Sequence, residues 1–75
     1  MQYYEKLKML REEHEPKLTQ EQLGAIFKLQ QRQISYLETG RTQPDIRTLT
    51  AYCNYFNVSA DYILGLPKNL PYPDM

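Results

Sequence analysis

Polar side chains with hydrogen-bonding ends are concentrated in one short segment, residues 30–36, which reads Gln-Gln-Arg-Gln-Ile-Ser-Tyr. Most of them are long and uncharged, whereas an ordinary surface helix more often carries Glu and Lys. Gln, Arg and Ser can form geometrically specific hydrogen bonds with base edges in the major groove of DNA. We therefore predict a base-reading surface, composed of Gln31, Arg32, Ser35 and Tyr36.

Each of these side chains has a chemical partner on DNA and a plainer alternative. Gln31 can pair with adenine and Arg32 with guanine, and each such contact discriminates by roughly 1–3 kcal/mol. Tyr36 can contact a thymine methyl group or a phosphate. The alternatives are a phosphate contact without sequence information for Arg32, solvation for Gln33, and packing on the helix surface for Tyr36.

Catalytic and metal-binding chemistry finds little support in the same sequence. The single cysteine, Cys53, and the single histidine, His14, cannot make a disulfide or a structural zinc site within one chain. No pair of carboxylates and no nucleophile with a base stands out, so we expect neither an enzyme nor a cofactor or metal. One cysteine, no signal peptide and no membrane span together indicate a cytoplasmic protein.

Length and charge limit the range of functions. The 75 residues are enough for one small domain, and 41% hydrophobic with 24% charged residues is ordinary for a globular protein. The net charge of zero argues mildly against nucleic-acid binding, because such proteins usually carry a basic surface. Cations nevertheless lie in or beside the polar segment, at Lys28, Arg32, Arg41 and Arg47. We therefore expect modest, salt-sensitive affinity for DNA.

Two short helices joined by a tight turn, over about residues 19–38, are predicted to position the base-reading surface. Thr19 and Gln22 form a capping-box pattern that starts the first of them. Gly24 costs roughly 1 kcal/mol in helix propensity relative to alanine, which makes sense where two helices approach closely. Apolar residues at helical spacing form the inward stripes: Leu23, Ile26, Phe27, Leu29, Ile34 and Leu37.

Three further helices complete an all-α prediction, a compact bundle of about five short helices. A helix over residues 2 to about 14 should end before Pro16, because proline disfavours the α conformation in the residue before it. Its inner face is predicted to hold Tyr3, Leu7, Leu10 and His14. The other two are predicted from a cap at Asp45 to about residue 56, and from a cap at Ser59 to about residue 64.

The C-terminal part of the chain divides into core and tail. The inner stripe of the fourth helix is predicted to be Ile46, Leu49, Tyr52, Cys53 and Phe56. We expect the domain to span residues 1–66 and a proline-rich tail to span residues 67–75. The tail can be a strap against its own domain, a strap against a second protomer, or an unstructured terminus.

The ordered set of residues resembles the phage lambda repressor and Cro family of helix-turn-helix DNA-binding proteins. The resemblance extends from about residue 7 to residue 65, and no single dipeptide in it is specific. Its residues are Thr19 to Gly24, Ile34, Ser35, Glu38, Gly40, Pro44, Leu49, Val58, Ser59, Asp61, Leu64 and Gly65. It implies a lambda repressor-like fold and a sequence-specific transcriptional regulator, a repressor, that reads double-stranded DNA with its third helix.

Lys28 and Gln30 depart from the family pattern, and Glu38 leads to a structural prediction. The family has glycine where this chain has Lys28, so Lys28 either adopts a left-handed conformation or changes the turn. Gln30 stands where the family prefers a serine or threonine cap. The family pairs a glutamate at the position of Glu38 with an arginine at the position of Arg11. The resemblance thus implies a buried Arg11–Glu38 ion pair, and an exposed pair is the alternative.

The resemblance also implies contacts with the DNA backbone and a mode of assembly. The helix start at Gln20 offers free amides that attract anions, and the loop after Glu38 holds phosphates in the family. The expected phosphate contacts are Gln20, Lys28, Gln30, Thr39, Gly40, Arg41, Thr42 and Gln43. Homodimers on a palindromic operator are the expected assembly, because half-sites repeat with the helical turn of DNA.

A second hypothesis keeps the fold but changes the partner. The neutral charge and the seven tyrosines favour a protein-interaction module, such as an antitoxin or an adaptor, to a small extent. This hypothesis predicts weak DNA binding and tight binding to a protein partner.

Overall fold

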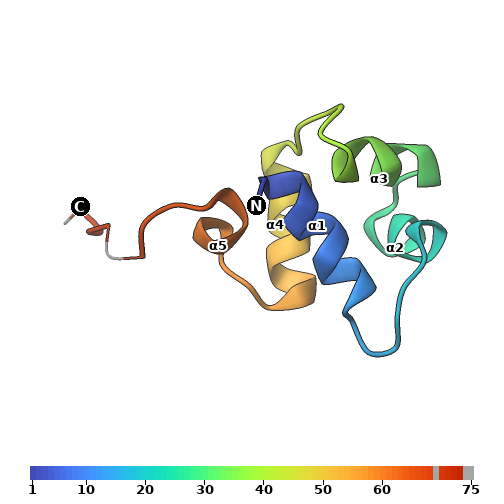
Figure 1. Cartoon of the computed structure of the whole chain (residues 1–75), viewed down its shortest axis with the longest axis horizontal. Helices are drawn as coiled ribbons and strands as arrows, with labels where there is room; N and C mark the ends of the chain where they lie inside the picture. The colour runs from blue at the N-terminus through green and yellow to red at the C-terminus, as the bar shows by residue number, and fades with distance from the viewer. Residues whose placement is uncertain (69, 74–75) are drawn as a thin grey trace.

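The computed structural model describes residues 1–68 and 70–73, and in this part of the chain the regular elements are all helices (Figure 1). They are α1 (Tyr3–Glu12), α2 (Gln20–Phe27), α3 (Gln31–Glu38), α4 (Ile46–Phe56) and α5 (Ala60–Leu64). The predicted all-α fold of five short helices is confirmed. Residues 69, 74 and 75 of the predicted tail lie outside the described residues.

The first helix is shorter than predicted. Helix α1 ends at Glu12, and the amide of Glu13 donates to the Met9 carbonyl as its cap. His14 therefore does not extend the inner face of α1. It lies in the following bend, where its ring stacks on Tyr55 of α4 at a centroid distance of 5.4 Å. Leu18, six residues after the end of α1, returns the chain to the core, where it is buried.

Every helix contributes to one core. The buried apolar residues are Leu7, Leu18, Leu23, Phe27, Ile34, Leu37, Tyr52 and Ile63. Phe27 of α2 and Tyr52 of α4 meet edge to face at 4.9 Å, a favoured geometry for aromatic pairs. Burial raises the pKa of the Tyr52 hydroxyl, because the interior disfavours the charged form. This core fixes α3 on α1 and α2, with one face of α3 left outside.

Two predicted core residues are exposed. Ile26 is 42% exposed and Ile46 is 85% exposed, so both predictions were wrong. Ile46 is the first residue of α4, and helical side chains tilt toward the N-terminus, which carries this one past the end of the core. Cys53 is partly buried against the core as expected, and burial raises the pKa of its thiol.

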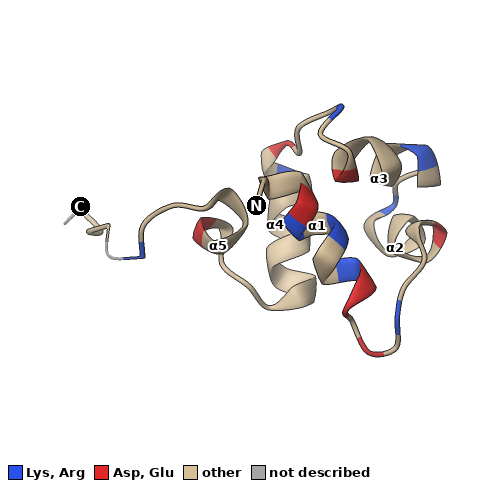
Figure 2. Ribbon diagram, in the orientation of Figure 1, with Lys and Arg blue, Asp and Glu red and all other residues tan. Residues whose placement is uncertain are grey.

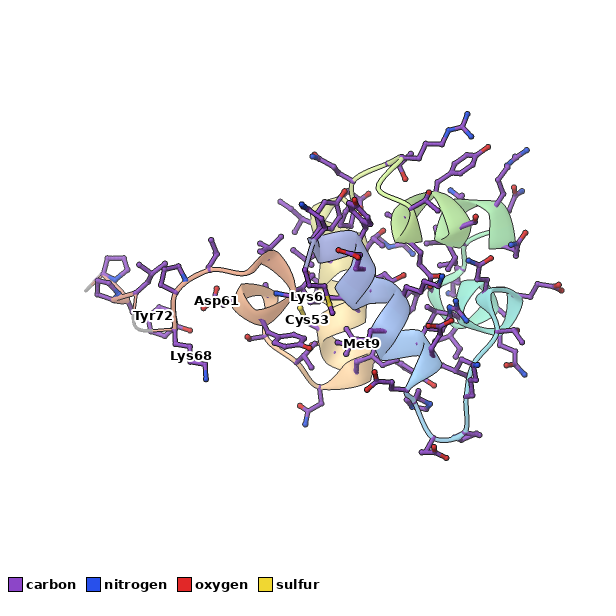
Figure 3. All side chains as sticks on the ribbon, viewed as in Figure 1. Lys6, Met9, Cys53, Asp61, Lys68 and Tyr72 are labelled. Carbon is purple, nitrogen blue, oxygen red and sulfur yellow. The ribbon has the colours of Figure 1, made fainter. Side chains whose placement is uncertain are left out.

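Helix α5 is attached to α1 and is followed by an extended tail. Lys6 reaches from α1 to α5, where its Nζ donates to the Tyr62 carbonyl at 2.8 Å (Figure 3). The tail then leads away from the helices, and Tyr72 is 98% exposed (Figures 1 and 3). Among the described tail residues, Leu70 and Tyr72 are not covered by the domain, so a strap against its own surface is not seen. No described helix is long and apolar enough to cross a membrane.

Candidate nucleic-acid interface

The start of α2 has the predicted capping box. Thr19 Oγ1 accepts from the Gln22 amide at 3.0 Å, and Gln22 Oε1 accepts from the Thr19 amide at 2.9 Å. At the other end of α2, Lys28 adopts the left-handed conformation with φ of 60° and ψ of 42°. Of the two alternatives, the left-handed Lys28 is the one adopted, at a cost of roughly 1–2 kcal/mol for a non-glycine residue.

Gly24 is the close-approach point between α2 and the start of α3. A Cβ atom on Gly24 would lie 2.7 Å from the carbonyl oxygen of Leu29, closer than real Cβ contacts allow. The Leu29 amide donates to the Gly24 carbonyl at 2.8 Å, which holds the turn against α2. The predicted close approach is confirmed, and its partner is the backbone of the turn.

Helix α3 begins without the serine or threonine cap that the family prefers, and Gln33 compensates. Gln33 Oε1 accepts from the Gln30 amide at 2.8 Å. The Gln30 side chain instead accepts from Arg32 Nη2 at 3.2 Å. Ile34 and Leu37 are buried on the inner side, which leaves the base-reading surface outside. On that surface Gln31 and Arg32 are exposed, whereas Ser35 and Tyr36 are half-buried.

The ion pair between Arg11 and Glu38 is buried, as the family resemblance implied. Arg11 Nε donates to Glu38 Oε2 at 2.7 Å, and Arg11 Nη2 donates to Glu38 Oε1 at 2.8 Å. The residues are 7% and 4% exposed. Arg11 Nη1 also donates to the Leu18 carbonyl at 2.9 Å, a contact that the sequence did not predict. The hydrogen bond to Glu38 raises the pKa of the Arg11 guanidinium, so the charge on Arg11 is secure.

A chain of amide hydrogen bonds connects this ion pair to the surface. Gln20 Nε2 donates to Glu38 Oε1 at 3.0 Å, and Gln20 Oε1 accepts from Gln31 Nε2. Gln20, predicted to contact a phosphate, thus uses its side chain inside the protein to hold Gln31. Its position at the first turn of α2 still places its backbone amide where an anion can bind.

The α3–α4 loop (residues 39–45) is tied back to Tyr36. The Tyr36 carbonyl accepts hydrogen bonds from the Arg41 amide at 2.9 Å and from the Thr42 amide at 3.3 Å. The Arg41 guanidinium lies over the Tyr36 ring, with Cζ 4.4 Å from the ring centroid. Sequence reasoning missed this contact, although the five-residue spacing across Gly40 was a visible signal of a returning chain.

Gly40 allows that return. Its φ of 76° is left-handed, and a Cβ atom there would lie 2.7 Å from the ring of Tyr4 on α1. The side chains of Arg41, Thr42 and Gln43 all remain exposed beyond it, as does Thr39 before it. Thr39 Oγ1 donates to the Ser35 carbonyl at 3.0 Å, so this hydroxyl is used to close α3.

The structure places the predicted residues on both flanks of α3, with Lys28 apart from them. A groove of about 640 Å³ between α3 and the α3–α4 loop is lined by Gln30, Arg32, Gln33, Tyr36, Thr42 and Gln43, among others. Gln20 and Gln31 lie on the other flank of α3, beside Arg11. Lys28 lines a separate hollow between α2 and α4, next to Ile26 and Arg47.

Charges are distributed unevenly over the neutral chain. Figure 2 shows basic positions at the start of α3 and at the tip of the α3–α4 loop. Acidic positions cluster at the end of α1 and in the loop after it, and further ones lie on α2, at the end of α3, next to the start of α4 and on α5. The one carboxylate within α3, Glu38, is the buried one. The outer surface of α3 thus presents Arg32 and neutral donors and acceptors, a combination suited to an anionic polymer with readable edges.

Comparisons with known proteins agree with this geometry. The crystal structure of the P22 c2 repressor protein in complex with synthetic operator 9T, in the presence of Tl+, is similar to this chain. The TM-score is 0.76 at 26% sequence identity, over 85% of this chain and 94% of that one. No curated protein matches the sequence significantly. The model of the helix-turn-helix family matches residues 7–63, and the chain therefore belongs to the helix-turn-helix family.

Proposed function

We propose that this protein is a transcriptional regulator, a repressor, that binds double-stranded operator DNA by placing α3 in the major groove. The observation that carries the proposal is the construction of α3. Its inner side is fixed by Ile34, Leu37 and the buried Glu38, and its outer side offers amide, guanidinium and hydroxyl groups. The similar P22 c2 repressor was crystallised with a synthetic operator, which supports the same use of the fold here.

The proposed contacts divide into base reading and backbone positioning. Base edges are read by the base-reading surface, with Gln31 on adenine and Arg32 on guanine. The phosphates are held by the α2 start at Gln20 and by the α3–α4 loop, and these contacts set the register of the protein on DNA. The proposed phosphate contacts in and before that loop are Gln30, Thr39, Gly40, Arg41, Thr42 and Gln43. A phosphate contact of Lys28 would have to come from its separate position beside Arg47.

Two copies of the protein are proposed to bind one palindromic DNA site. The proposed location of the protein is the cytoplasm. One α3 covers only a few base pairs, and a two-fold dimer doubles the readable sequence by repeating the contact one helical turn away. The palindrome follows from the symmetry of the protein pair.

The test is a titration of isotope-labelled protein with mixed-sequence duplex DNA at low salt, followed through backbone amides by NMR. We expect shifts at Gln20, at residues 30–36 and at residues 40–43, which weaken as salt is added. An Arg32→Ala variant should weaken binding. Lys68→Ala, which removes the same charge from the exposed tail, should leave binding unchanged. Absence of shifts on α3 at near-millimolar DNA would refute the proposal and favour a protein partner.

A further inference from the structure

Resting on the proposed function, we propose that Arg41 is a positioning residue for base recognition, which holds the Tyr36 ring so that it contacts a thymine methyl group. The proposal rests on the position of the Arg41 guanidinium over the Tyr36 ring, with Cζ 4.4 Å from the ring centroid. A contact with a phosphate alone would not require this arrangement.

The backbone brings Arg41 to this place independently of its side chain. The Tyr36 carbonyl accepts hydrogen bonds from the amides of Arg41 and Thr42 and from Thr39 Oγ1, at 2.9, 3.3 and 3.3 Å. The left-handed Gly40 turns the chain back over α3. A substitution of the Arg41 side chain therefore removes the guanidinium and leaves the loop in place.

A free tyrosine side chain on a helix surface samples several rotamers, so a contact with one methyl group would be lost for much of the time. The guanidinium covers one face of the Tyr36 ring and restricts that freedom. Tyr36 also lines the groove between α3 and the α3–α4 loop, beside Arg32 and Gln33. The ring thus lies at the edge of the base-reading surface that faces the α3–α4 loop.

The partner that fits the ring is apolar and projects into the major groove. The thymine methyl group is the one base substituent there that meets this description. A guanidinium carries five N–H donors, and a contact with an aromatic ring leaves some of them free for a hydrogen bond. Arg41 can therefore hold the ring and donate to a phosphate at the same time, which makes its effect on DNA binding partly sequence-dependent.

The stack itself can be tested without DNA. The ring current of Tyr36 should shift the side-chain proton resonances of Arg41 upfield in the free protein. Tyr36→Leu should abolish the shift, whereas Tyr36→Phe, which keeps the ring, should retain it. Arg41 resonances that are the same in wild type and Tyr36→Leu would overturn the proposal, whatever the protein binds.

The test on DNA uses the preferred duplex from a site selection, with each thymine replaced in turn by deoxyuridine, which lacks only the methyl group. We expect one position in each half-site where the replacement weakens wild-type binding about four-fold, as for one buried methyl group. Arg41→Lys keeps the charge but cannot stack in the same way. This variant should show the same salt dependence of DNA binding as wild type and lose the preference for thymine over uracil. Thr42→Ala is the matched loop control and should keep the preference.

The outcomes separate this proposal from the proposed function. If Arg41→Lys and Arg41→Ala keep the thymine preference and only bind all sequences more weakly, Arg41 is a phosphate contact and the positioning role is wrong. If wild type binds its selected site with no thymine-sensitive position, the methyl contact is wrong and the DNA-binding function stands. If wild type selects no site, the proposed function fails. Unchanged thermal midpoints of the variants would show that each remains folded.

Discussion

The Glu38 carboxylate lies within the helix that is proposed to enter DNA, yet it is turned away from the phosphates. Its two oxygens accept from Arg11, and one also accepts from Gln20. Burial of a charge is costly unless it is paired and hydrogen-bonded, and here each oxygen has a partner. This residue thus fastens α1 to α3 at no electrostatic cost to the outer surface.

Glu38→Gln should destabilise the protein by about 3–5 kcal/mol, because it leaves the Arg11 charge buried without a counter-charge. Urea unfolding monitored by circular dichroism measures the change. The control is Glu12→Gln on exposed α1 surface, which should change stability by less than about 1 kcal/mol. Replacement of both partners, Arg11→Met with Glu38→Leu, should recover most of the loss. Equal effects of Glu38→Gln and Glu12→Gln would contradict the structural role.

Lys28 carries backbone strain that glycine would not. Its φ of 60° costs a non-glycine residue roughly 1–2 kcal/mol. Glycine avoids this strain, but it loses more conformational entropy on folding, which offsets part of the gain. Lys28→Gly should therefore raise the free energy of unfolding by about 0.5–1 kcal/mol. Lys28→Ala is strained in the same way and should be close to neutral, so a gain in both variants would point to charge instead of conformation.

At the scale of elements, α2 and the start of α3 approach closely because Gly24 has no side chain. Gly24 meets the carbonyl oxygen of Leu29, which belongs to the backbone of the turn. Backbone at this point cannot move aside without displacing the start of α3. The position of the base-reading surface thus depends on a residue that has no part in reading.

Gly24→Ala tests that dependence. Alanine has the better helix propensity by about 1 kcal/mol, so propensity alone predicts stabilisation. The overlap with Leu29 should instead destabilise the protein by about 1–3 kcal/mol and weaken DNA binding. Ala25→Gly, at the exposed neighbouring position in α2, should lose about 1 kcal/mol through propensity and keep DNA binding. Unfolding curves and binding titrations of both variants decide between the two effects.

Helix starts were predictable because their chemistry is local. Thr19, Asp45 and Ser59 cap the helices that follow them, and the left-handed Lys28 could be expected from the family turn. The exposed Ile26 and Ile46 were not predictable, since helical periodicity gives a face but not how far the core extends along it. The contact of Arg41 with Tyr36 was missed for a related reason, because it depends on the path of a loop.

At the scale of the whole molecule, a net charge of zero is compatible with a surface for DNA. A cluster of acidic positions at the end of α1 and in the following loop lies away from the start of α3 and the tip of the α3–α4 loop (Figure 2), whereas Asp45 lines the groove itself. With a Debye length of about 8 Å at physiological salt, distant carboxylates affect a bound phosphate little. Affinity should depend on the few cations near the groove, and not on the total charge.

The salt dependence of binding counts those cations. If Arg41 neutralises one phosphate in each copy of a dimer, these two contacts should contribute about −2 to the slope of the logarithm of the binding constant against the logarithm of salt concentration. Arg41→Gln should reduce the magnitude of this slope by about one per subunit. Lys68→Gln, on the tail, should leave the slope unchanged. Fluorescence anisotropy over a series of salt concentrations measures all three.

The hydrogen bonds from Glu38 through Gln20 to Gln31 have a consequence for how recognition can change. A carboxylate only accepts, so it turns the Gln20 nitrogen inward and the Gln20 oxygen outward, and Gln31 must then donate. The buried charge of Glu38 therefore sets the donor-to-acceptor direction of this hydrogen-bond chain. It also decides which atom of Gln31 stays free for a base. A neutral residue at position 38 that can donate would allow the donors and acceptors of this chain to exchange roles. New sequence preferences could then arise from a substitution that no DNA ever touches.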